Sequence, residues 1–234
     1  MENSKRKAGY RKIELTCAQA KADGIKYAWV DTCCINKDSS AELSEAINSM
    51  YAWYSKASVC YAYIEDVSFP DNGDSPNTDS LKDCRWFSRG WTLSELLAPS
   101  EIFFYGPNWN EFGRKTEIYE TLHDITGIPQ DILRKEKRFE DVNVAARMSW
   151  AAERQTTRPE DLAYCLMGIF DINMPLLYGE GNKAFIRLQE QIMSQIQDDS
   201  LFAWCSTAEP AHEFPYRGLL ASSPRELQGC SDLA

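Results

Sequence analysis

Apolar and polar residues along the first half of the chain follow a pattern that predicts helices and strands in turn. Residues 8–22 carry apolar side chains at helical spacing and end at an Asp-Gly pair, which is typical of a helix followed by a turn. Residues 25–31 (IKYAWVD) predict a strand. Ser39 and Glu42 then predict a capping box that opens a second helix with one apolar stripe.

Two further apolar runs continue the alternation. Residues 59–64 (VCYAYI) are apolar on both faces, as expected of a strand inside a parallel sheet. Residues 102–105 (IFFY) predict another strand, which follows a helix containing Glu95. This order predicts an α/β fold with a doubly wound, mostly parallel sheet and helices on both faces. We expect five side chains to be mostly buried in adjacent parallel strands: Tyr61, Tyr63, Ile64, Phe103 and Phe104.

The second half of the chain predicts short helices instead of alternation. We therefore divide the chain into residues 1–127, the sheet domain, and residues 128–234, a mainly helical extension with a short strand at 201–204 and an irregular tail. Thr157 and Glu160 predict a capping box before a helix at 161–167. The clearest amphipathic helix of this half ends at Gln195.

Composition excludes several classes of function. Hydrophobic residues make up 44% and charged residues 26% of the chain, as in a globular protein. The net charge of −10 disfavours nucleic-acid binding. We expect no membrane span, because the longest apolar run is too short. Eight cysteines without a C-x-x-C pair, and only two histidines, predict no metal site and a reduced, cytoplasmic protein.

The segment RWFSRGWTLSELLA, residues 85–98, holds the main candidate for chemistry, Glu95. One interpretation is a capping box between Thr92 and Glu95. The other is a functional carboxylate, because ligands of such sheets bind at the carboxyl ends of the strands, where Asp31 and the loop containing Asn36 are also expected. Asp31 fits a structural role, at the end of its strand or as a turn cap, as well as it fits a functional one.

Three long motifs carry a family resemblance. They are YAWVDTCCINKDSSAELSEAINSMYAWYSKASVCYAYIEDV at 27–67, RWFSRGWTLSELLAPSEIFFYG at 85–106, and MSWAAERQTTRPEDLAYCLMGIFDINMPLLYGEGNKAFIRLQEQI at 148–192. Together they resemble the heterokaryon incompatibility (HET) domain proteins of filamentous fungi. The resemblance implies a cytosolic effector of allorecognition and programmed cell death. It also implies an additional first strand, Tyr-Ala-x-Leu-Ser-His-x-Trp, which this sequence lacks, so we expect a sheet without its usual first strand.

A more distant resemblance suggests an activity. The pattern Trp91-x-x-x-Glu95-Leu96, followed by EIFFY, is similar to the segment of TIR domains that carries the catalytic glutamate of NAD-cleaving enzymes. It implies a TIR-like (flavodoxin-like) sheet, NAD as substrate, no cofactor, and Glu95 as the catalytic residue. The expected substrate-binding residues are Trp91, Arg89, Arg85, Asp31 and Asn36.

The chemistry of NAD cleavage is compatible with a single carboxylate. Nicotinamide leaves the cationic ring as a neutral molecule and needs no general acid, so a fixed negative charge near the ribose is the main requirement. The alternative is a non-catalytic module, or an inactive truncated relative, that self-associates or docks on other incompatibility or NLR-type proteins.

Overall fold

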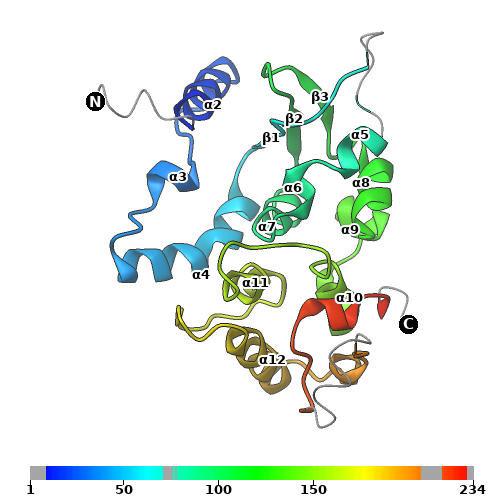
Figure 1. Ribbon diagram of the computed structural model, residues 1–234. Helices are drawn as coiled ribbons and strands as arrows, with labels where there is room; N and C mark the ends of the chain where they lie inside the picture. Colours follow the sequence, from blue (N-terminus) through cyan, green and yellow to red (C-terminus); the bar gives the residue numbers. More distant parts are fainter. Residues whose placement is uncertain (1–8, 71–75, 77, 207–217, 231–234) are drawn as a thin grey trace.

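A computed structural model describes residues 9–70, 76, 78–206 and 218–230. A small sheet lies at one end of the molecule, with α6 and α7 beneath it and α10, α11 and α12 at the opposite end (Figure 1). The elements of the first half are α2 (Tyr10–Ala22), α3 (Asp31–Cys34), α4 (Ser40–Lys56), β1 (Cys60–Tyr63), α5 (Thr78–Lys82), α6 (Arg85–Ser88), α7 (Thr92–Leu97), β2 (Ile102–Tyr105) and β3 (Glu111–Arg114). Those of the second half are α8 (Tyr119–Thr126), α9 (Gln130–Leu133), η1 (Phe139–Asp141), α10 (Val144–Ser149), α11 (Asp161–Tyr164), η2 (Met167–Ile169), α12 (Lys183–Gln195), η3 (Asp199–Phe202) and η4 (Pro224–Leu227).

The sheet among the described residues has the order β1-β2-β3. The two predicted strands β1 and β2 are adjacent and parallel, with Cys60 opposite Ile102, as expected. β3 was not predicted, and it pairs with β2 in the antiparallel sense. Because β1 forms an edge of this sheet, the prediction that residues 59–64 lie in its interior was wrong. The structure supports the α/β class, whereas the doubly wound, TIR-like arrangement stays a prediction.

Residues 25–31 do not form the predicted strand. Residues 24–30 have no regular secondary structure, and Asp31 already begins α3. A strand needs a neighbour to pair with its backbone, and a cleft separates this segment from β1. Tyr27, on the expected strand, is 89% exposed.

The two faces of the sheet differ in burial. Ile102 and Phe104 point to the face that is packed on the core, where Phe104 contacts Trp86 edge-on at 5.8 Å between ring centroids. The opposite face is only half-covered. Asp23, which follows α2, accepts a hydrogen bond from Tyr61, and Gln19 of α2 accepts one from the indole of Trp109. The burial prediction was therefore right for Ile64 and Phe104 and wrong for three aromatic residues that stay half-exposed, namely Tyr61, Tyr63 and Phe103.

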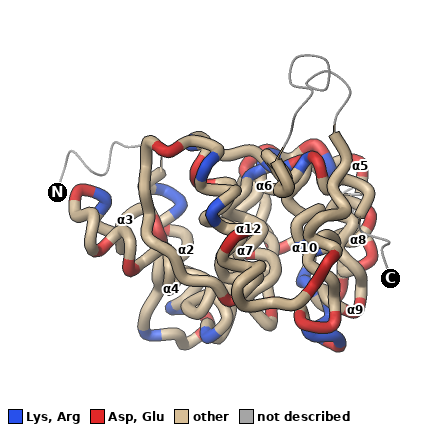
Figure 2. Tube along the Cα trace, turned by 90° about the horizontal axis from the view of Figure 1, so that it is seen from below, with Lys and Arg blue, Asp and Glu red and all other residues tan. Residues whose placement is uncertain are grey.

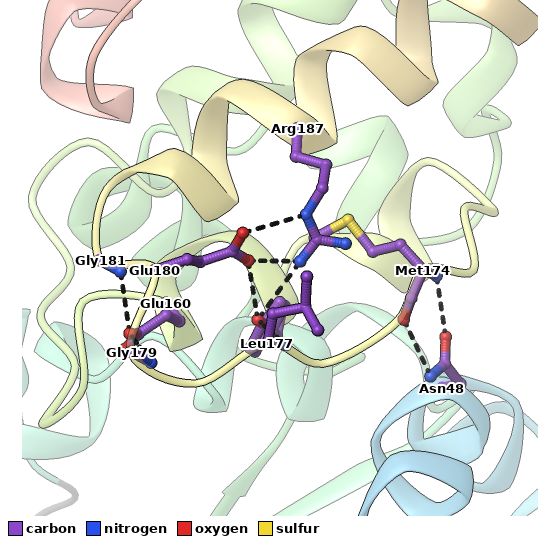
Figure 3. A network of polar contacts seen from close by, with 9 residues as sticks. Asn48, Glu160, Met174, Leu177, Gly179, Glu180, Gly181 and Arg187 are labelled. Carbon is purple, nitrogen blue, oxygen red and sulfur yellow. Dashed lines mark hydrogen bonds and ion pairs between the residues drawn. The ribbon is translucent and has the colours of Figure 1, made fainter.

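Local contacts also replaced two predicted features of the second half. Residues 201–204 do not form a strand, because Asp198 accepts a hydrogen bond from the amide of Ser200 and starts the short helix η3. Glu160 forms no capping box. Its carboxylate instead accepts hydrogen bonds from the amides of Gly179, at 2.7 Å, and Gly181, at 3.0 Å (Figure 3).

One buried cluster contains residues from both halves of the chain. Helix α4 joins them, because Asn48 bonds both the carbonyl and the amide of Met174 (Figure 3). Helix α4 also packs on η2, where a Cβ at Gly168 would lie only 2.2 Å from the Cβ of Tyr51. The division at residue 127 stays a prediction, and residues 207–217 and 231–234 of the predicted tail lie outside the described residues.

Candidate functional site

A cleft of about 560 Å³ opens between β1 and the irregular segment 25–30. Its walls come from α2, from the start of α3, from the last turns of α4 and from β1, and Glu95 of α7 reaches it from the protein interior. The volume is typical of a pocket for a small molecule. The polar and aromatic side chains that line it are Lys12, Thr16, Tyr27, Trp29, Asp31, Trp53, Tyr54, Lys56, Ser58, Cys60, Tyr61 and Glu95.

Glu95 is half-buried, and polar and charged side chains from several elements lie near its carboxylate. The Tyr54 hydroxyl of α4 donates a hydrogen bond to its carboxylate. Burial raises the pKa of Glu95, and so does the negative charge of Asp31, while Lys12 and Arg89 act in the opposite direction. A carboxylate in a partly apolar pocket with a nearby second carboxylate is a common arrangement in functional sites.

The proposed capping box does not account for Glu95. Helix α7 begins at Thr92, its N-cap position is Trp91 in a helical conformation, and no side chain caps it. The Thr92 hydroxyl donates to the backbone carbonyl of Arg89 at 2.8 Å instead of accepting from the helix. The Glu95 side chain is therefore available to the cleft and to Tyr54.

Buried cations fix both ends of the helix that carries Glu95. At its start, the Arg154 guanidinium donates to the carbonyl of Arg89 at 2.8 Å and to the hydroxyl of Thr92 at 3.0 Å. At its end, the Lys115 ammonium donates to the carbonyls of Leu96, at 2.9 Å, and of Pro99, at 3.1 Å. Positive charge is favourable at a helix C-terminus. Burial lowers the pKa of Lys115 to about 7 and that of Arg154 to about 10.

Of the site residues predicted from sequence, the structure brings Glu95 and Asp31 to the same cleft. The other four lie outside its lining. Trp91 is half-buried, and its indole donates a hydrogen bond to Asp161. Arg85 and Arg89 are exposed, although the positive charge of Arg89 still lowers the pKa of Glu95. Asn36 is exposed as well, and its side chain accepts a hydrogen bond from the amide of Asp38.

Sequence reasoning missed the residues that helices contribute to the cleft. Lys12 lies on α2, and Trp53 and Tyr54 lie in the last turns of α4. Trp29 contacts both Trp53 and Tyr54. Its ring centroid lies 5.5 Å from that of Trp53 and 5.7 Å from that of Tyr54. The available signal was the concentration of aromatic residues at 51–54, which is more than the apolar stripe of α4 requires.

Other site types have no support in the described part of the chain. Within it, no three His, Cys, Asp or Glu side chains are grouped in a way that would hold a metal ion. None of its helices has the length and apolar character needed to cross a membrane. Acidic and basic residues are interspersed along the described chain (Figure 2).

Comparison with known proteins agrees with the motifs. Residues 3–74 match the family model described as heterokaryon incompatibility protein (HET), and residues 183–231 match a domain of unknown function (DUF8212). The chain is 46% identical over 212 residues to the vegetative incompatibility protein HET-E-1 of Podospora anserina. That match covers 88% of the chain but 15% of the relative, so the chain spans a small part of its length. No solved structure gives a significant match. The chain belongs to the heterokaryon incompatibility (HET) protein family.

Proposed function

We propose that this HET domain acts in the cytoplasm as an effector of heterokaryon incompatibility and cell death, and that it does so by hydrolysing NAD at Glu95. The single observation that carries the activity is the position of Glu95. Its half-buried carboxylate lines a cleft of about 560 Å³ together with Asp31 and three aromatic side chains, Trp29, Trp53 and Tyr54. The likeness of the Trp91–Leu96 segment to TIR domains supports the same assignment.

In the proposed reaction, the bond between C1′ of the ribose and the nicotinamide nitrogen breaks first. Its electron pair moves to the ring, which leaves as neutral nicotinamide. Glu95 stabilises the positive charge that develops at C1′, and the hydrogen bond from Tyr54 keeps its carboxylate in place. Water then forms a bond to C1′ and releases one proton, so the products are ADP-ribose, nicotinamide and a proton.

The test is nicotinamide release from NAD by the purified chain, measured by chromatography. Glu95→Gln keeps the shape of the side chain and removes its charge, so we expect a loss of at least about 100-fold in rate. Glu45→Gln, an exposed residue on α4, is the matched control and should be fully active. Equal rates for the wild-type protein and Glu95→Gln would show that Glu95 is not the catalytic residue.

The second candidate function is a non-catalytic module that self-associates or docks on other incompatibility or NLR-type proteins. The half-exposed aromatic face of the sheet, with Tyr61, Tyr63 and Phe103, favours this alternative, because exposed aromatic residues are common at interfaces. Light scattering of the purified chain separates the two functions. A stable oligomer with no nicotinamide release, in which Glu95→Gln changes neither property, would favour the module.

A further inference from the structure

Charges of opposite sign enter the cleft from different elements. The carboxylates come from Asp31 at the start of α3 and from Glu95 of α7. The ammonium groups come from Lys12 in the first half of α2 and from Lys56 at the end of α4. A ligand that satisfies all four groups must carry both a region that accepts hydrogen bonds from cations and a region that offers hydroxyl groups or positive charge to carboxylates.

Lys12 is the better placed of the two lysines. It is half-buried, whereas Lys56 is exposed. Among the described residues, no hydrogen bond or ion pair holds the Lys12 ammonium, yet its charge reaches both Glu95 and Cys60 inside the cleft. An ammonium group in this position can bind an anionic part of a ligand, and lysine is a frequent partner of phosphate.

The walls of the cleft fit the remaining parts of a nucleotide. Trp29 and Trp53 meet edge-on and present aromatic surface, of which Trp53 is 40% exposed. Aromatic side chains of this kind stack on flat heterocyclic rings. Asp31 and Glu95 line the same cleft, and a carboxylate can accept hydrogen bonds from ribose hydroxyls. The two arginines expected to bind the substrate, Arg85 and Arg89, both lie outside the lining.

We infer that Lys12 is the diphosphate-binding residue of the cleft, and that the ligand is a ribonucleotide carrying a diphosphate. This inference rests on the proposed function, for which it names the part of the substrate that the protein binds through charge. Lys12 binds the diphosphate, Asp31 and Glu95 bind the ribose next to the scissile bond, and the Trp29–Trp53 wall binds a ring.

The test compares ADP-ribose with adenosine, which lacks both phosphates, by isothermal titration calorimetry. We expect Lys12→Ala to weaken ADP-ribose binding about tenfold or more and to leave adenosine binding unchanged, because one charge-assisted contact is lost. Lys12→Arg should retain most of the affinity. Lys21→Ala, an exposed residue on the same helix and outside the cleft, is the matched control.

Three results would overturn the inference: equal ADP-ribose affinity of Lys12→Ala and the wild-type protein, equal loss of adenosine affinity, or no binding of ADP-ribose by the wild-type protein. Nicotinamide release is measured in parallel with NAD and with nicotinamide riboside, which lacks the diphosphate. If binding depends on Lys12 and no nicotinamide is released, the hydrolase proposal fails and the inference stands. If Lys12→Ala cleaves both substrates at wild-type efficiency, the hydrolase proposal stands and the inference fails.

Discussion

The buried lysine at the end of α7 allows a stability experiment that needs no substrate. Lys115 is 1% exposed, and its ammonium donates hydrogen bonds to two carbonyls. Burial, together with the positive charge of Lys135, lowers its pKa from the ordinary value of 10.5 to about 7. In the unfolded chain the same group keeps its proton up to about pH 10.4. The folded protein therefore releases this proton at a much lower pH than the unfolded chain does.

The sign of the pH dependence follows from proton linkage. Between the two pKa values the unfolded chain binds more protons, so the free energy of unfolding increases with pH. Below the folded pKa both states carry the proton, and the full cost of burying the charge is present. Linkage with these pKa values gives a gain of about 2 kcal/mol between about pH 6 and about pH 8.5. For a chain of this size, that gain corresponds to roughly 4–8 °C in Tm.

Lys115→Met removes the titrating group and keeps an unbranched side chain. Urea unfolding of the wild-type protein and the variant across this pH range should show their difference in stability shifting by about 2 kcal/mol in favour of the wild-type protein as the pH rises. Taking the difference cancels the contributions of the cysteines and tyrosines with raised pKa values. It also cancels the constant cost of leaving the carbonyls of Leu96 and Pro99 without this donor.

Lys37→Met is the control for this experiment, because Lys37 is exposed. Its stability difference from the wild-type protein should not change with pH. If the free energies of unfolding of Lys115→Met and the wild-type protein differ by a constant amount from pH 6 to pH 8.5, Lys115 keeps its proton in the folded protein. That result would refute the claim that burial lowers its pKa.

Two further predictions concern α4. Tyr54→Phe removes the hydrogen bond to Glu95, a contact that lowers the pKa of that carboxyl, so the acidic limb of the pH–rate profile for nicotinamide release should move to higher pH; an unchanged limb would show that Tyr54 does not act on Glu95. Gly168→Ala places a Cβ against the side chain of Tyr51 and should destabilise the protein by about 1–3 kcal/mol in urea unfolding, whereas Gly24→Ala, where a Cβ meets no atom within 4 Å, tests only the cost of a positive φ.

Several elements of the fold were predictable because local signals determine them. Helix α2 ends where the periodic pattern ends, and Gly24 follows with φ of +74°. Helix α4 begins after Ser39, whose side chain accepts a hydrogen bond from the amide of Glu42, as one half of a capping box requires. The second bond of the box is replaced. The Glu42 carboxylate accepts a hydrogen bond from the amide of Asn36, and the amide of Ser39 donates to the carbonyl of Asn36.

Strands were harder to predict because their stability depends on a partner. Residues 25–31 have strand composition but pair with no strand in the described part of the chain, whereas β3 has the unremarkable sequence EFGR and pairs with β2. Gly113 of β3 allows Ile118 to approach closely, since a Cβ there would lie 2.9 Å from its side chain. A contact of this kind between segments cannot be recognised from hydrophobic alternation.

The site was predictable only in part, for a similar reason. Glu95 and Asp31 were expected at one edge of a sheet, and they do share a cleft, although no strand carries Asp31. The sequence analysis did not single out Lys12 or Trp53, because helical periodicity predicts which face of a helix a residue occupies and not what lies opposite that face. The pairing of α2 and α4 across the cleft is a property of the tertiary structure.

The two buried cations around α7 suggest why the Glu95 position is costly to the fold. Arg154 and Lys115 donate to carbonyl and hydroxyl oxygens, and among the described residues neither forms an ion pair with a carboxylate. Burying a charge in this way costs more free energy than an apolar side chain of similar volume would. What the arrangement provides is a helix fixed at both ends, so that a carboxylate near its middle keeps one position while the opposite wall of the cleft is an irregular segment. If Lys115→Met is more stable than the wild-type protein and no longer releases nicotinamide from NAD, then burial of Lys115 both destabilises the fold and holds Glu95 in its active position.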